Sequence, residues 1–166
     1  MSEVEREWPD RLDGDELTVQ TRFLGFLRAT AVGKLAGLNR EQAVAAPLPS
    51  SPRTSALGVL KHLTAVERWW LSIEAGGAAL PSLWPGSPDP SWDVTPQDDP
   101  ESVITAYRAE WVHSANALAE LVPEERTRRS GEFTVRWVLA HVVQETARHV
   151  GHLDALRELA DGAVGE

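Results

Sequence analysis

Apolar residues recur every three or four positions in four long stretches of the chain, which is the spacing of one face of an α-helix. The stretches cover residues 15–38, 55–75, 99–121 and 134–161. Each begins at a residue suited to cap a helix, such as Asp99, which is followed by a proline. No stretch has the alternating pattern of a strand, so the sequence predicts an all-α protein.

Residues 76–98 separate the second and third helices by a connection that is long for a compact domain. It holds five prolines and two tryptophans, Trp84 and Trp92, and has neither helical nor strand spacing. A crossover of this length lets the second and third helices run the same way, whereas the short links make the other neighbours antiparallel. We therefore expect a four-helix bundle of up-down-down-up order in a single domain spanning residues 1–166, with residues 1–14 as a lead-in.

The fourth predicted helix carries His141, Glu145, His149 and His152 at spacings of four, four and three residues. On an α-helix these spacings place all four side chains along one stripe. The stripe runs beside apolar positions of the same helix, so we expect the imidazoles and the carboxylate to point into the packed interior. Burying such groups costs several kcal/mol unless they are paired or bound to a cation. This helix is therefore predicted to carry part of a metal site.

His62, on the second predicted helix, also lies on an apolar face. When the second and fourth helices pack together, His62 can face Glu145 and His149, which makes a His₂Glu ligand set of the kind used by catalytic zinc. The same set suits nickel, iron or manganese, and three protein ligands leave a position open to water or substrate. His141 and His152 compete for the ligand role, or contact a ligand or the substrate. The other interpretation is that these are core residues satisfied by hydrogen bonds.

Three further residues on these helices have simpler interpretations. Glu67 and Arg68 are charged, and we expect both to face solvent. The indole of Trp137 is costly to expose, so we expect it to lie in the core.

The composition narrows the classes of partner. The formal net charge is -9 with no cluster of basic residues, which argues against a nucleic acid or an anionic membrane surface as a partner. The chain has no cysteine, so disulfides, thiolate ligands and a cysteine nucleophile are excluded. No apolar run is long enough to span a bilayer, and the acidic N-terminus lacks a hydrophobic signal region. We expect a cytoplasmic protein.

The segments KHLTAVERWW (residues 61–70) and RWVLAHVVQETARHVGHLDALRE (residues 136–158) resemble the DinB-like four-helix bundle superfamily. The resemblance is closest to the branch that includes the mycothiol-dependent maleylpyruvate isomerase N-terminal domain. It implies a divalent metal, bound in many members by one histidine of the second helix and two of the fourth. Those positions fall on His62, Glu145 and His149, with glutamate replacing one histidine as in the isomerase branch. The resemblance also implies a homodimer in many cases and a small thiol such as mycothiol or bacillithiol.

Together these features predict a metal-dependent transferase or isomerase that acts on a small-molecule substrate with a mycothiol-like thiol. The metal would favour the thiolate form of that thiol. We expect Trp84 and Trp92 to cover the substrate, and Arg148 either to steer an anionic group or to be a plain surface arginine. The alternative function is a non-catalytic metal-binding or stress-response bundle. A third interpretation is a bundle without metal, whose histidines are satisfied by hydrogen bonds.

Overall fold

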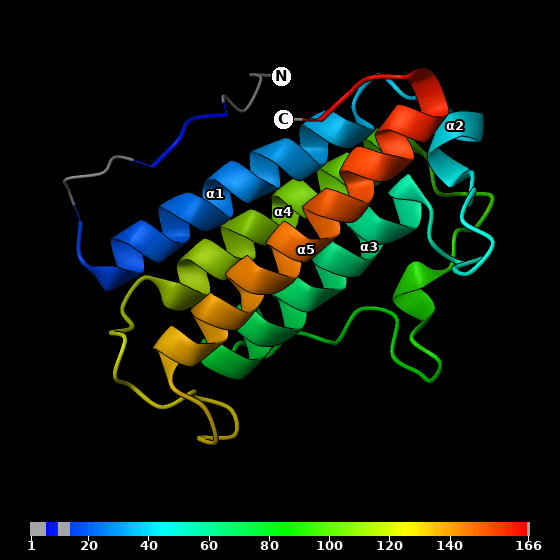
Figure 1. Ribbon diagram of the computed structural model, residues 1–166. Coiled ribbons are helices and arrows are strands. Elements are labelled where there is room, and N and C mark those ends of the chain that lie inside the picture. The colour runs from blue at the N-terminus through cyan, green and yellow to red at the C-terminus, as the bar shows by residue number, and fades with distance from the viewer. Residues whose placement is uncertain (1–5, 10–13, 166) are drawn as a thin grey trace.

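The computed structural model describes residues 6–9 and 14–165, and these residues form helices joined by loops (Figure 1). In the described part of the chain, β pairing is limited to an isolated antiparallel bridge between Arg126 and Thr134. The prediction of an all-α protein is therefore confirmed. The α-helices are α1 (Glu16–Leu35), the short α2 (Arg40–Val44), α3 (Ala56–Glu67), α4 (Pro100–Leu118) and α5 (Val135–Asp161).

Each long helix begins where a side chain caps it. Asp15, Ser55, Asp99 and Thr134 each accept a hydrogen bond from a backbone N–H in the first turn that follows. This bond satisfies one of the donors that a helix leaves unpaired at its start. The far end of α5 stops at Gly162, whose φ of 79° is the left-handed conformation that glycine adopts without strain.

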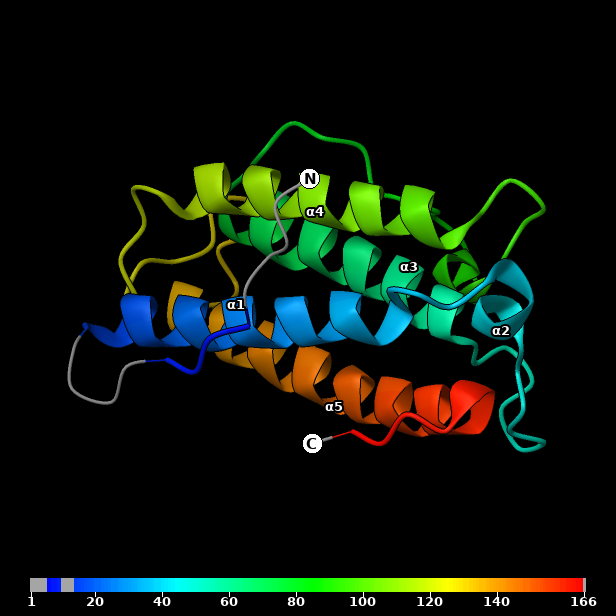
Figure 2. The same cartoon turned by 90° about the horizontal axis from the view of Figure 1, so that it is seen from above.

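The four long helices lie side by side along most of their length (Figures 1 and 2). In both views α1 and α5 run in one direction, and α3 and α4 run in the other. Two clusters of buried apolar side chains fill the space between them. Tyr107 and Leu153 belong to one cluster, and Leu24 and Leu139 belong to the other. No helix of the described residues is long and apolar enough to cross a membrane.

The second predicted helix changes its winding instead of continuing as an α-helix. After α3 it becomes a π-helix, η1 (Arg68–Ala75). The wider turn appears in the bond from the Gly76 N–H to the carbonyl of Leu71, five residues earlier, at 3.0 Å. Ser72 and Glu74 are buried in this segment. Glu74 accepts a hydrogen bond from the Thr127 hydroxyl at 2.7 Å, which ties η1 to the loop before α5.

The expectation that Glu67 and Arg68 face solvent is wrong. Glu67 is fully buried, and both its oxygens accept hydrogen bonds from the Arg28 guanidinium, at 2.8 and 2.5 Å. The Arg68 Nε donates to the buried Glu110 carboxylate at 2.7 Å, and the Ser72 hydroxyl donates to its other oxygen. The partners come from α1 and α4, so the sequence of α3 alone gave no sign that these charges would be paired inside the bundle.

The crossover between η1 and α4 packs closely on α3. It contains a short 3₁₀-helix, η2 (Pro90–Trp92), whose backbone approaches α3 at Gly58. A Cβ at Gly58 would lie 2.9 Å from the Trp92 carbonyl oxygen, so only glycine permits this approach without a shift. The Lys61 Nζ donates to the Asp93 carbonyl at 2.7 Å and to Asp98 at 2.8 Å. These contacts hold the crossover against the face of α3 that carries His62.

Candidate metal centre

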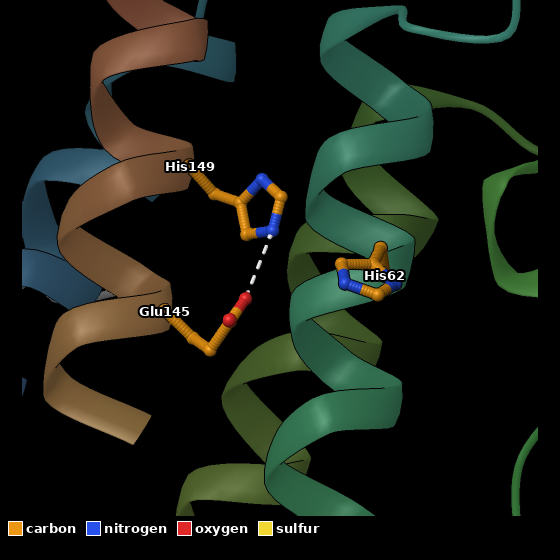
Figure 3. A group of neighbouring side chains, drawn as sticks. All are labelled: His62, Glu145 and His149. Atoms are coloured by element: carbon orange, nitrogen blue, oxygen red, sulfur yellow. Dashed lines mark ion pairs between the residues drawn. The ribbon is translucent and has the colours of Figure 1, made fainter. Parts of the chain in front are cut away.

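His62 on α3 converges with Glu145 and His149 on α5 (Figure 3). One potential ligand atom from each residue lies within 4.8 Å of the other two. The His149 Nε2 lies 3.3 Å from a Glu145 oxygen, and the centroids of the two imidazole rings are 5.0 Å apart. His149 is buried and the other two are half-buried. The antiparallel packing of α3 and α5 thus assembles the three residues that the sequence pattern singled out.

Residues of the crossover orient His62. Its Nδ1 lies 3.0 Å from the Ser91 hydroxyl and 3.2 Å from an Asp89 oxygen. Asp89 also accepts a hydrogen bond from the Ser91 N–H, so the same carboxylate both caps η2 and contacts the His62 ring. The Trp92 ring stacks on His62 with centroids 4.4 Å apart and meets His149 edge-on at 5.4 Å. With Nδ1 occupied, Nε2 is the nitrogen left to bind a metal.

A second histidine orients His149. The Nδ1 atoms of His149 and His152 are 3.2 Å apart, so one of them donates a hydrogen bond to the other. This contact uses the ring nitrogen that faces away from Glu145. His152, one helical turn further along α5, therefore holds the His149 ring in the orientation that turns its Nε2 toward Glu145.

Burial keeps both imidazoles of the cluster neutral at pH 7. Burial, with help from the nearby His62, lowers the pKa of His149 to about 4. Burial also lowers the pKa of His62, against the opposing charges of Asp89 and Glu145. For Asp89, burial acts to raise the pKa, but hydrogen bonds from Ser91 and the proximity of His62 outweigh it and lower that pKa. The neutral imidazoles are the form that binds metals, and the Asp89 carboxylate beside them stays ionised.

A family model described as mycothiol-S-transferase matches residues 19–162. The chain belongs to the mycothiol-S-transferase family. The resemblance to DinB-like proteins near the mycothiol enzymes is thereby confirmed. A search of curated proteins found no match to the chain. All three residues of the cluster fall within the part that matches the mycothiol-S-transferase family.

The donor set of this family member fits a divalent metal. Two imidazoles and one carboxylate are ligands that zinc takes in catalytic sites. The 3.3 Å between the His149 Nε2 and the Glu145 oxygen is near the spacing of about 3.4 Å between two ligands of a tetrahedral ion with bonds of about 2.1 Å. Because the three ligand atoms already lie within 4.8 Å of one another, small side-chain rotations bring all of them to one ion.

The structure places the remaining residues singled out from the sequence in different surroundings. His141 lies in a different group, stacked on Trp137 at 5.1 Å and edge-on to Trp70 at 4.8 Å. The prediction that Trp137 is a core residue is wrong, because it is 46% exposed at the edge of that aromatic group. Trp84 packs over the Lys61 ammonium at 4.8 Å, and no ring contact joins it to the cluster. Arg148 is exposed beside His149, where its charge helps to lower the pKa of that histidine.

Sequence reasoning missed two residues of this family member's site, Asp89 and Ser91. Both lie in the crossover, which has no periodic pattern to place its side chains. The available signal was the run Asp-Pro-Ser-Trp at residues 89–92, where an acid precedes proline at the start of a helical turn. That signal predicts a local cap, but not the approach of the cap to His62.

Proposed function

We propose that this protein is a metal-dependent transferase in which His62, Glu145 and His149 hold a divalent ion, zinc ahead of nickel, iron or manganese. The observation that carries the proposal is the convergence of these three ligand atoms between α3 and α5. Membership of the mycothiol-S-transferase family supplies the rest of the proposal. The thiol is mycothiol, and the second substrate is a small molecule with an electrophilic carbon.

A bound divalent ion supplies the positive charge that lowers the pKa of a thiol and makes it nucleophilic at neutral pH. The chain's own residues prepare for this. The Asp89 carboxylate accepts a hydrogen bond from the His62 Nδ1–H, which leaves the Nε2 lone pair free. In the tautomer that keeps the Nε2 lone pair for a metal, His149 would donate from Nδ1 to His152, and its Nε2 faces Glu145. In the transfer, the thiol S–H bond breaks and its proton passes to solvent. The thiol sulfur then forms a bond to the electrophilic carbon, and the leaving group of that carbon departs with the electron pair of its former bond.

Trp92 is the proposed cover of the site, since its ring stacks on one proposed ligand and meets the other edge-on.

The remaining expectations about fold, location and oligomeric state are also part of the proposal. They are an up-down-down-up four-helix bundle, supported by the helix directions in Figures 1 and 2, a single domain, a cytoplasmic location and a homodimer.

The first experiment measures the metal content of the purified protein, after reconstitution with zinc and removal of excess ion. Wild type, His149→Ala, Glu145→Ala and His141→Ala are compared side by side. His141→Ala is the matched control, because this histidine lies on the same stripe of α5 but packs on Trp70 and Trp137. We expect about one metal ion per chain in wild type and in the control, and loss of metal in the other two variants.

The second experiment follows consumption of mycothiol with an electrophile, on the same four proteins. Metal-dependent turnover in wild type and in His141→Ala, but in neither of the other variants, supports the transferase. Stoichiometric metal without turnover would favour a non-catalytic metal-binding bundle. No metal in reconstituted wild type would refute the site itself and leave hydrogen-bonded core histidines.

A further inference from the structure

A cavity of about 680 Å³ lies along α1, on residues that the metal centre does not use. Its wall includes the second half of α1, Arg108 of α4, and Arg157 and Ala163 at the end of α5 and just beyond it. The volume is within the range of about 300–1,000 Å³ that is usual for small-molecule sites. The cavity is therefore large enough for a metabolite and separate from the proposed transferase site.

The described residues that line this cavity include four cationic side chains and no acidic one. The four are Arg6, Lys34, Arg108 and Arg157. Such a concentration is unusual in a chain of formal net charge -9. Low-dielectric walls focus the field of such charges, and those without a carboxylate beside them favour an anion in the cavity.

Arg108 is the cationic residue whose charge is left unbalanced. Its side chain is half-buried, and its Nε is fully buried without a hydrogen-bond partner among the described residues. No carboxylate of the described chain pairs with it, in contrast to Lys34 with Asp154 and Arg157 with Asp161. A buried donor on a charged group is costly to leave unsatisfied. The planar guanidinium is suited to bind a carboxylate or a phosphate through two hydrogen bonds.

The other cationic residues are held in place by the protein. The Arg6 Nε donates to the Thr30 hydroxyl at 2.8 Å, and its guanidinium lies over the Phe26 ring. Arg157 donates to the backbone carbonyls of Lys34 and Ala36, which fixes it against the end of α1. Because these side chains are already ordered, a ligand would not have to order them on binding.

We infer that this cavity is a binding site for a small organic anion, with a carboxylate or phosphate group against Arg108. The site is independent of the metal centre, because none of its described lining residues belongs to the His62 cluster. Phosphate esters and carboxylic acids share the oxyanion that the guanidinium recognises. Inorganic phosphate and succinate are therefore the two probes that distinguish these sources.

The test is isothermal titration of the full-length protein with each probe at low ionic strength. The variant Arg108→Gln removes the charge, and we expect it to weaken binding by about 10- to 100-fold, the usual effect of losing hydrogen bonds to a charged group. The matched control is Arg128→Gln, an exposed arginine in the loop between α4 and α5, at the other end of the bundle (Figure 1). We expect the control to bind as wild type does.

A second variant tests the cavity without changing its charge. Gly33 lines the cavity, and a Cβ there meets nothing within 4 Å, so Gly33→Leu fills the space while α1 is kept. We expect it to abolish binding of whichever probe binds wild type. The inference is overturned if neither probe binds wild type, if Arg128→Gln weakens binding as much as Arg108→Gln does, or if Gly33→Leu binds normally.

Discussion

Removing Arg28 leaves a carboxylate buried in the bundle without its cation. Glu67 is fully buried at the end of α3, and the Arg28 guanidinium binds both of its oxygens. Without Arg28, the Glu67 carboxylate keeps a long hydrogen bond from the Ser114 hydroxyl, at 3.3 Å, and no cation among the described residues pairs with it. In Arg28→Met the apolar stem is kept and the charge is lost, so the variant isolates the ion pair from the packing of the side chain.

The expected loss in free energy of unfolding is about 3–5 kcal/mol, the usual result of breaking a buried pair from one side. A change of 1 kcal/mol shifts the melting temperature of a chain of this size by about 2–4 °C, so the expected fall is about 6–20 °C. The double variant Arg28→Met with Glu67→Leu removes both charges. It should regain about 2 kcal/mol or more, because no unpaired charge remains in the interior.

Urea unfolding followed by circular dichroism measures these differences. The matched control is Arg136→Met, which breaks exposed ion pairs with Glu16 and Glu124 and should cost no more than about 1 kcal/mol. The reasoning fails if Arg28→Met costs no more than this control. It also fails if the double variant is less stable than Arg28→Met, since the penalty would then come from lost packing and not from the unpaired carboxylate.

Three other predictions concern the metal centre and the crossover. Because the pKa of His149 is lowered to about 4, the unfolded chain binds more protons than the folded chain between about pH 6.5 and pH 4. The metal-free protein should therefore lose stability as the pH falls through this range, and His149→Gln should show a shallower slope in pH-dependent unfolding, the rest coming from His62. Asp89→Asn should lower metal affinity by about 10- to 100-fold in chelator competition, whereas Asp93→Asn, in the same crossover without a contact to the cluster, should not. Gly58→Ala should lower the melting temperature, because its Cβ would lie 2.9 Å from a backbone oxygen of the crossover, whereas the unobstructed Gly151→Ala should leave it unchanged or raise it.

The helices were predictable because their signals are local. Apolar spacing and capping residues placed the starts of the long helices within one residue, and Asp99 and Thr134 cap where expected. The change to a π-helix at Arg68 was not predictable in this way. The periodic pattern continues through that point, and the bonds that secure η1 come from the distant Thr127 and Glu110.

The residues of the candidate site were likewise predictable only where the signal is local. The i,i+4 spacing of Glu145 and His149 fixes their proximity on any α-helix, so the sequence alone determined that pair. Its partner His62 was inferred from helix packing and from family resemblance, and the structure brings it to the pair. The sequence could not place Asp89, because a loop residue without periodicity reaches its partner only through the path of the whole crossover.

The sequence by itself therefore determined which stretches are helical, where they begin, and which side chains share one face, because these properties depend on residues a few positions apart. The tertiary structure alone decided which polar groups are satisfied. It paired Glu67 with Arg28, set Asp89 against His62, and separated His141 from the histidines of the cluster. Burial and pairing depend on residues tens of positions apart, and the packing of the helices and the crossover is what brings them together.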